Sequence, residues 1–296
     1  MSSKQIKTLA LVFLIVLDAA LAGLVWFRYR QKNYYDGEIV RNVNALLGKS
    51  SIYLNTSVLS EKIVSYPVLV GSATEADYRE ALGRMAGADV RETEKGLECS
   101  GKTGLYRLDA GHLFSYEAHG FSPAPESETV SVADGEKIGA EAAARLSSFV
   151  MGGDRADVSS GGKYAIGFSC REIAYSVSGG YYVATMDLMA GGLVTDAALS
   201  VRFRDDTFLT VEGNLLMASP SRSLKPGGKD LLTILLNEKA YWDAGSEKRI
   251  RLIGSVEYAY AIYYDMKDSF YLIPVCRLCY EDGTVAEYDM MTGERQ

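Results

Sequence analysis

The strongest constraint in this sequence is an apolar run over residues 8–27, close to the N-terminus. Of these 20 residues, 12 are Leu, Ile, Val or Phe, and only Asp18 is charged. At about 1.5 Å per residue, a helix of this length is about 30 Å long, which matches the hydrocarbon thickness of a bilayer. The apolar side chains contribute roughly −5 kcal/mol to insertion, against about +3 kcal/mol for a central Asp. The run therefore predicts a transmembrane helix.

A cleaved secretory signal peptide is the alternative interpretation of the same run. Lys4 and Lys7 form a basic leader, and the Ala-Leu-Ala sequence at 20–22 fits a small-residue cleavage site. We favour an uncleaved anchor, because the apolar run continues past that site through Trp26. Both interpretations place the rest of the chain outside the cytoplasm.

The orientation of the predicted span does not follow from its flanking charges, which are balanced on the two sides. We expect a cytoplasmic N-terminus, because a short N-terminal segment before a long polar remainder usually stays inside. The expected location is therefore the cell membrane, with a single span and the bulk of the chain extracytoplasmic.

Asp18 indicates what the span contacts. An ionisable residue in mid-span normally faces protein, so Asp18 predicts a contact with a partner's transmembrane helix. Ala19, Ala22 and Gly23 lie beside it or one turn on, and their small side chains would let a second backbone approach closely. The alternative is a polar residue tolerated near a depth from which its side chain reaches the interface.

Composition excludes several function classes. Lys and Arg number 31 against 38 Asp and Glu, which gives a net charge of −7 and argues against a nucleic-acid partner. Four Cys and two His leave little for a zinc site with several ligands. We expect no cofactor, no metal ion and no catalytic residue.

Hydrophobic periodicity predicts an α+β fold in which helices precede groups of antiparallel strands. Thr74 and Asp77 have the spacing of a capping box, and Gly87 follows as a C-terminal signal. Helices are expected over 39–47, 74–86, 138–150 and 231–241. Strands are expected as a meander over 90–119, and over 164–175, 181–189, 193–203, 208–216, 256–264, 270–280 and 284–290.

Two stretches rich in Pro, Gly and Ser, residues 122–126 and 219–228, read as linkers. The order of helix followed by strands recurs after each linker, as a weak internal repeat. The predicted organisation is a cytoplasmic tip and transmembrane anchor at 1–30, an α+β region at 31–122, and helix-plus-sheet modules at 129–218 and 226–296.

Residues 96–103, GLECSGKT, satisfy the P-loop pattern GxxxxGK[ST]. That site requires an apolar strand before the loop and a helix after it. Charged residues precede this motif and alternating, strand-like sequence follows it, so a Gly-rich hairpin turn is the favoured interpretation. Ser160 and Lys163 match SxxK and residues 102–104 match KTG, but their order is the reverse of that in serine enzymes.

Cys276 and Cys279 have the CxxC spacing of redox and metal sites. They lie in an expected strand, where residues three apart face opposite sides, so we interpret them as structural. His112 and His119, seven residues apart in strand-like sequence, are likewise expected on opposite faces.

The basic N-terminus, the span with a central polar residue and the stretch LLGKSSIYLNTSVLSEKIVSYPVL at 46–69 together resemble the YycI family. Its members are membrane-anchored accessory proteins of the YycG-type (WalK) sensor histidine kinase of Gram-positive bacteria. Residues 271–294 are similar to the end of PepSY-like modules, through the matching residues Pro274, Gly283, Asp289, Thr292 and Gly293. Cys276 stands where those modules carry an aromatic residue.

The resemblance implies a non-enzymatic regulator in signal transduction to the cell envelope, which acts through its helix on the kinase alongside a YycH-like protein. Two classes of function therefore compete. One is this membrane-anchored regulatory binding protein. The other is an exported PepSY-like protease inhibitor or a cell-wall-associated enzyme.

Overall fold

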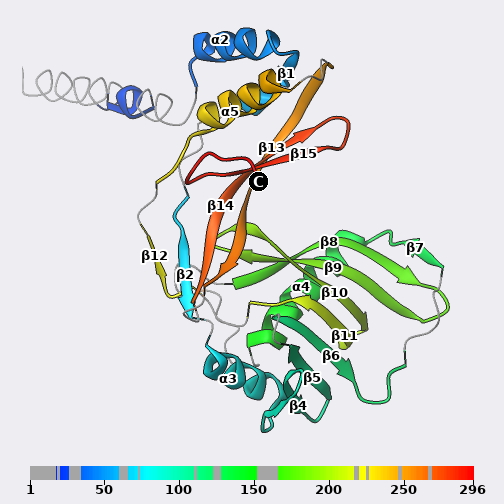
Figure 1. Ribbon diagram of the computed structural model, residues 1–296. Coiled ribbons are helices and arrows are strands. Elements are labelled where there is room, and N and C mark those ends of the chain that lie inside the picture. Colours follow the sequence, from blue (N-terminus) through cyan, green and yellow to red (C-terminus); the bar gives the residue numbers. More distant parts are fainter. Residues whose placement is uncertain are drawn as a thin grey trace, which may run out of the picture. The chain divides into compact units, whose positions relative to one another are not determined.

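The chain is described by a computed structural model. The structure describes residues 18, 21–26, 35–59, 66–72, 74–109, 112–122, 128–151, 166–216, 220–224, 227–245, 249–265 and 269–296. It is an α+β fold, as the sequence predicts, and its strands form a large, mostly antiparallel sheet. Two compact units divide the chain (Figure 1): unit 1 is Met1–Tyr66, Gly228–Glu257 and Cys276–Gln296, and unit 2 is Pro67–Gly227 and Tyr258–Val275.

Unit 2 is built on antiparallel strands joined by tight turns. The predicted meander is present as β3 (Arg91–Thr93), β4 (Gly96–Ser100), β5 (Gly104–Asp109) and β6 (Leu113–Ala118). The sheet continues from β6 through β11 (Thr207–Asn214), β10 (Leu193–Arg204), β9 (Tyr181–Ala190), β8 (Ile166–Ser176) and β7 (Thr129–Ser131). Alternate residues of β10 are buried, which is the period-two pattern of a strand with one covered face.

A second set of strands joins this sheet at β10. Val194 and Thr195 pair in parallel with Ala259 and Tyr260 of β13 (Arg251–Tyr264). The order continues through β14 (Ser269–Tyr280), β2 (Leu69–Ser72) and β12 (Arg222–Ser223). Residues 219–228, expected as a linker, thus contain a short strand, because backbone groups of 221–224 pair with the free edge of β2.

Two helices of unit 2 match their predicted positions. In α3 (Glu75–Ala86), the Thr74 side chain accepts from the Asp77 amide while the Asp77 side chain accepts from the Thr74 amide, which confirms the capping box. Gly87 ends α3 in the left-handed conformation. Helix α4 (Gly135–Met151) packs on β8, where a Cβ on Gly139 would lie 2.7 Å from the Cys170 Sγ atom.

Unit 1 contains α2 (Gly37–Gly48), the turn of 3₁₀ helix Thr56–Leu59 and α5 (Leu231–Ala244). Asp36 caps α2 by accepting from the Glu38 amide at 3.0 Å. Strand β1 (Ile52–Leu54) pairs in parallel with the start of β13, and β15 (Val285–Asp289) pairs with β14.

The two units divide the chain differently from the four predicted segments. Strand pairing explains the difference, since β6 from segment 31–122 pairs with β11 from segment 129–218. The predicted segment 226–296 is divided as well, because the second half of β13 and the first half of β14 belong to unit 2. Residues 123–126 of the first predicted linker lie outside the described residues.

Candidate functional site

The structure describes three of the four residues that are predicted to contact a partner's transmembrane helix. Asp18, Ala22 and Gly23 are helical and exposed, whereas Ala19 lies outside the described residues. A Cβ on Gly23 would meet no heavy atom within 4 Å. Most of the run 8–27 lies outside the described residues as well, so the contact stays a prediction.

Large apolar side chains in the described part of this run are exposed to solvent. The exposed fractions are 51% for Leu21, 59% for Leu24, 68% for Val25 and 61% for Trp26. Within the described residues, no helix combines the length and the apolar character needed to cross a membrane.

A cleft of about 960 Å³ opens in unit 2, and it is the candidate binding site. Its walls are the C-terminal ends of α3 and α4, the β4–β5 turn, the end of β6 and the start of β11. The volume is at the upper end of the range for small-molecule sites. All of these elements belong to unit 2.

One wall of this cleft depends on a close contact between the backbone of the β4–β5 turn and the end of α3. A Cβ on Gly101 would lie 2.5 Å from the Ala86 carbonyl oxygen, which is closer than real Cβ contacts come. Glycine therefore allows the β4–β5 turn to pack against the end of α3. The turn places Lys102 and Thr103 in the lining of the cleft, to which α3 contributes Arg84.

Aromatic rings form the floor of the cleft. Phe149 of α4 stacks on Tyr106 with ring centroids 5.8 Å apart, and its ring meets Tyr116 edge-on at 5.0 Å. Tyr106 and Tyr116 are buried, while Phe149 is half-buried and faces the cleft. Such ring pairs prefer these offset and edge-on arrangements, which fix the position of each ring.

Hydrogen bonds hold the floor to the β4–β5 turn. The hydroxyl groups of Thr103 and Tyr106 are 2.9 Å apart, and the Tyr116 hydroxyl donates to the Thr103 carbonyl at 3.3 Å. The His119 Nε2 atom lies 2.9 Å from the Gly101 carbonyl oxygen. Burial raises the pKa of Tyr106, and its hydrogen bond with Thr103 opposes that change.

The P-loop pattern is confirmed as a hairpin turn. Residues 96–100 are β4, and β5 follows directly at Gly104 where a P-loop needs a helix. Gly96 has a φ of +134°, and a Cβ there would lie 2.2 Å from the Leu108 carbonyl oxygen. Both pattern glycines, Gly96 and Gly101, are thus required by packing. Ser160 and Lys163 of the SxxK pattern lie outside the described residues.

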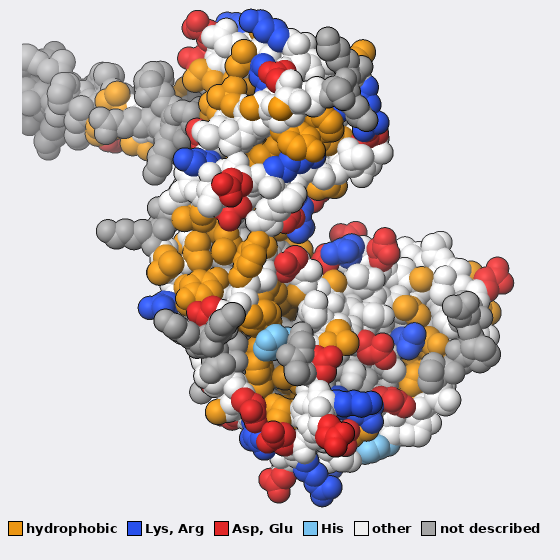
Figure 2. Space-filling model, viewed as in Figure 1, with side chains coloured by type: hydrophobic (Ala, Val, Ile, Leu, Met, Phe, Trp, Pro, Cys, Tyr) orange, Lys and Arg blue, Asp and Glu red, His pale blue; other side chains and the backbone are white. Residues whose placement is uncertain are grey.

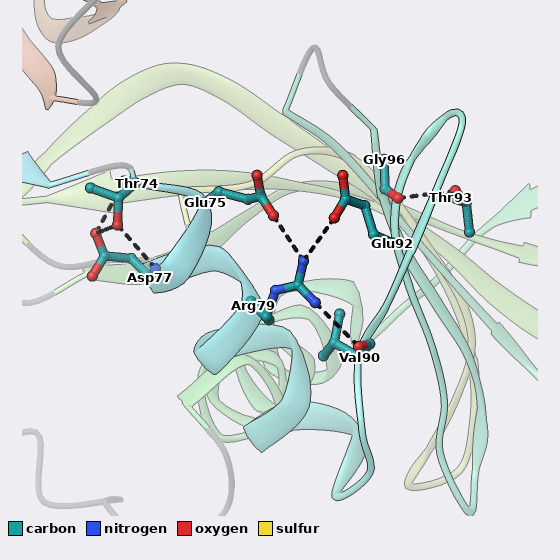
Figure 3. A network of polar contacts seen from close by, with 8 residues as sticks. All are labelled: Thr74, Glu75, Asp77, Arg79, Val90, Glu92, Thr93 and Gly96. Atoms are coloured by element: carbon teal, nitrogen blue, oxygen red, sulfur yellow. Dashed lines mark hydrogen bonds and ion pairs between the residues drawn. The ribbon is translucent and has the colours of Figure 1, made fainter.

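On the β3–β4 side of α3, Arg79 holds a polar network together (Figure 3). Its Nη2 atom lies 2.8 Å from Glu75 Oε1 and 3.3 Å from Glu92 Oε2, and its Nη1 atom donates to the Val90 carbonyl at 3.4 Å. These side chains are 40–70% exposed, so each pair stabilises the fold by at most about 1 kcal/mol. Figure 2 shows acidic and basic side chains interspersed around α3 and β4. We interpret the network as a tie between α3 and β3.

His112 lies between two tyrosine rings of unit 2. Its ring stacks on Tyr264 at a centroid distance of 4.1 Å and lies 5.1 Å from Tyr78. Burial lowers the pKa of His112, and the nearby Asp109 carboxylate opposes that change. Among the described residues, no group of three or more His, Cys, Asp or Glu side chains could hold a metal ion.

Unit 1 contains a buried carboxylate, Glu238 of α5. The hydroxyl groups of Tyr280 and Tyr288 donate to it, as does the Trp242 Nε1–H at 2.5 Å. The Arg295 Nη1 atom lies 3.5 Å from Glu238 Oε2. Burial, followed by the contact with Glu238, raises the pKa of both tyrosines, so they stay protonated and can donate. The cluster fastens α5 to β14, β15 and the C-terminal residues.

Asp289, Thr292 and Gly293, three of the residues that resemble the end of PepSY-like modules, form a turn after β15. The Asp289 side chain accepts from the Met291 and Thr292 amides at 2.6 and 3.1 Å. Gly293 has a φ of +80°, and its carbonyl oxygen accepts a hydrogen bond from the Asn237 side chain of α5 at 2.7 Å. This turn is thus tied to α5 by a hydrogen bond.

Cys276 and Cys279 both lie on β14. Cys276 is fully buried and Cys279 is half-buried, and residues three apart on a strand face opposite sides. Burial is the main cause of a raised pKa at Cys279, which makes a reactive thiolate less available.

Three cleft residues, Arg84, Lys102 and Phe149, were not predicted as site residues. In the sequence, Lys102 belongs to the P-loop pattern, which does not indicate this cleft. Phe149 belongs to the expected helix 138–150, where an apolar residue indicates core packing. Their proximity depends on contacts between α3, α4 and the β4–β5 turn, for which the sequence carries no local signal.

No protein-family model and no curated protein sequence matches this chain. Among solved structures, the chain is similar to the crystal structure of an uncharacterized protein from Eubacterium rectale ATCC 33656, with a TM-score of 0.41 and 12% sequence identity. The match covers 83% of this chain and 90% of that one. At this level of similarity, no family is assigned.

Proposed function

We propose that this chain is a non-enzymatic regulator of a sensor histidine kinase of the YycG (WalK) type, anchored in the cell membrane by residues 8–27. The N-terminus is cytoplasmic and the bulk of the chain is extracytoplasmic. The regulator acts through transmembrane and extracytoplasmic contacts, together with a YycH-like protein. The resemblance of residues 46–69 and 271–294 supplies the partner class.

The observation that carries this proposal is the exposure of apolar side chains in the helical segment 21–26. Leu24, Val25 and Trp26 are each more than half exposed to solvent. Contiguous exposed apolar surface marks a site of contact with a membrane or with another protein. A span that pairs with a partner's helix provides both kinds of contact.

In this proposal, the extracytoplasmic part consists of modules in which a helix packs on an antiparallel sheet. The contact of Gly139 of α4 with Cys170 of β8 supports this arrangement in one module. The hydrogen bonds from Tyr280 and Tyr288 to Glu238 of α5 support it in the other.

A span exchange tests the proposal. The tagged full-length chain, extracted with detergent from a Gram-positive host, should co-purify with the sensor kinase. A control chain, in which residues 8–27 are replaced by an unrelated apolar span of equal length, should reach the membrane but recover several-fold less kinase. Equal recovery by both chains would contradict a role for the span in partner contact.

Mass spectrometry of the same preparation tests the anchor itself. The N-terminal peptide that precedes residue 8 should remain attached to the membrane-extracted chain. A mature N-terminus at Gly23 would show that residues 1–22 are a signal peptide.

A further inference from the structure

We propose that the cleft of unit 2 binds a small organic acid, one that carries one or two negative charges on an apolar ring. The inference goes beyond the proposed function, because it rests on the residues of the cleft and not on the anchor or on a kinase.

The first observation is an excess of positive charge in the lining. Among the described residues that line the cleft, Arg84, Lys102 and Arg204 are cationic and Asp206 is anionic. Asp206 forms an ion pair with Arg145, so it does not neutralise these three. This local excess stands out in a chain of net charge −7.

Two of these cations are available to a ligand. The Arg204 guanidinium donates to the carbonyl oxygens of Gly179 and Gly180, both at 2.7 Å. Arg84 and Lys102 are exposed, and within the described part of the chain neither forms an ion pair. A carboxylate or similar anion between them would supply the missing partner.

Compensation of helix dipoles is the simplest rival explanation for these cations. The C-terminal ends of α3 and α4 both reach the cleft, and each carries a partial charge of about −0.5. Together they offset only about one of the three positive charges. The remaining charge of about +2 suits a mono- or dianion and is too small for a polyanion such as a triphosphate.

The second observation is the apolar surface among the lining residues of the cleft. Phe149, Phe121 and Met85 are half-buried and line the cleft, so each offers part of its surface to a ligand. The Phe149 ring is held in place by Tyr106 and Tyr116. A rigid ring of this kind favours a flat apolar partner over a flexible one.

Calorimetric titration of the full-length chain in detergent tests this proposal with three probes: 1-naphthoate, acetate and 1-naphthylmethanol. The chain should bind 1-naphthoate at least about tenfold more tightly than either fragment of it, since a tenfold ratio corresponds to about 1.4 kcal/mol. Equal affinity for 1-naphthoate and acetate, or for 1-naphthoate and 1-naphthylmethanol, would overturn the proposal.

Matched variants locate the binding. The double variant Arg84→Gln/Lys102→Gln should weaken 1-naphthoate binding by about tenfold or more, from the loss of charged contacts. The control Arg91→Gln/Lys95→Gln removes the same charge from exposed residues of β3 and its turn that do not line the cleft, and it should bind as the wild type does. Equal losses in the two double variants would overturn the proposal, because they would show a general charge effect.

The variant Phe149→Leu tests the apolar part separately. It should weaken 1-naphthoate binding several-fold and leave acetate binding unchanged. Unchanged 1-naphthoate binding would overturn the assignment of a ring-bearing ligand. None of these outcomes depends on whether a kinase co-purifies, so failure here is distinguishable from failure of the proposed function.

Discussion

Gly101 and the Ala86 carbonyl group make a contact that excludes any side chain, since a Cβ on Gly101 would lie 2.5 Å from the carbonyl oxygen. The contact joins the β4–β5 turn to the end of α3. It thereby sets the distance between the turn, with Lys102, and the helix, with Arg84. The shape of the candidate cleft therefore depends on this close backbone contact.

Replacing Gly101 by Ala should therefore destabilise unit 2 by about 1–3 kcal/mol, the usual cost of overpacking against a backbone that has to shift. Hydrogen exchange of the α3 and β4 amides measures the effect, and exchange should accelerate in both elements. Gly167→Ala on β8 is the matched control, because a Cβ there meets nothing within 4 Å. Wild-type exchange in Gly101→Ala would show that the contact is looser than described.

The Tyr288 hydroxyl group provides a test of the buried Glu238 cluster. Tyr288→Phe leaves a buried carboxylate oxygen with one fewer donor, which should cost about 1–3 kcal/mol. The α5 amides should then exchange faster, whereas Tyr53→Phe on β1, a residue that is 47% exposed, should leave them unchanged. If the two variants behave alike, the hydrogen bond to Glu238 does not stabilise unit 1.

His112 should make unit 2 less stable in mild acid. Burial lowers its pKa in the folded chain below the unfolded value of about 6.5, so the unfolded state binds the proton more readily. The stabilising effect of the neutral ring is complete above about pH 6.5 and is lost as the pH falls towards the folded pKa.

The unfolding temperature of the wild type should fall between pH 7 and pH 5 by more than that of His112→Asn. Asn is chosen because it tolerates the φ of +64° at this position. An NMR titration of the His112 ring gives its pKa directly, and a value at or above 6.5 would contradict the explanation.

Local features of the fold could be predicted from the sequence. The capping box at Thr74 and Asp77 and the turns at 179–180, 191–192 and 205–206 are determined by residues a few positions apart. The short strands β1, β2, β7 and β12 were not predicted, because strands of two to four residues carry too little periodicity. Their pairing partners are far away in the sequence.

The candidate cleft could not be predicted for the same reason. Pairing of β6 with β11 connects parts of the chain that the sequence assigns to different modules. Glu238 is a second case, because a charged residue in a helix normally predicts a solvent-facing position. Its burial follows from hydroxyl donors on β14 and β15, some 40–50 residues further along the chain.

The most direct test of the proposed function is the variant Asp18→Leu in the full-length chain. In the proposed span, the Asp18 carboxyl would weaken insertion by about 3 kcal/mol, and a hydrogen bond to a partner's helix would return about 1–2 kcal/mol of this. Asp18→Leu should therefore insert more strongly, yet recover several-fold less sensor kinase or YycH-like protein on co-purification and alter the kinase output. Recovery and signalling at wild-type levels would contradict the account, because the span would then serve only as an anchor.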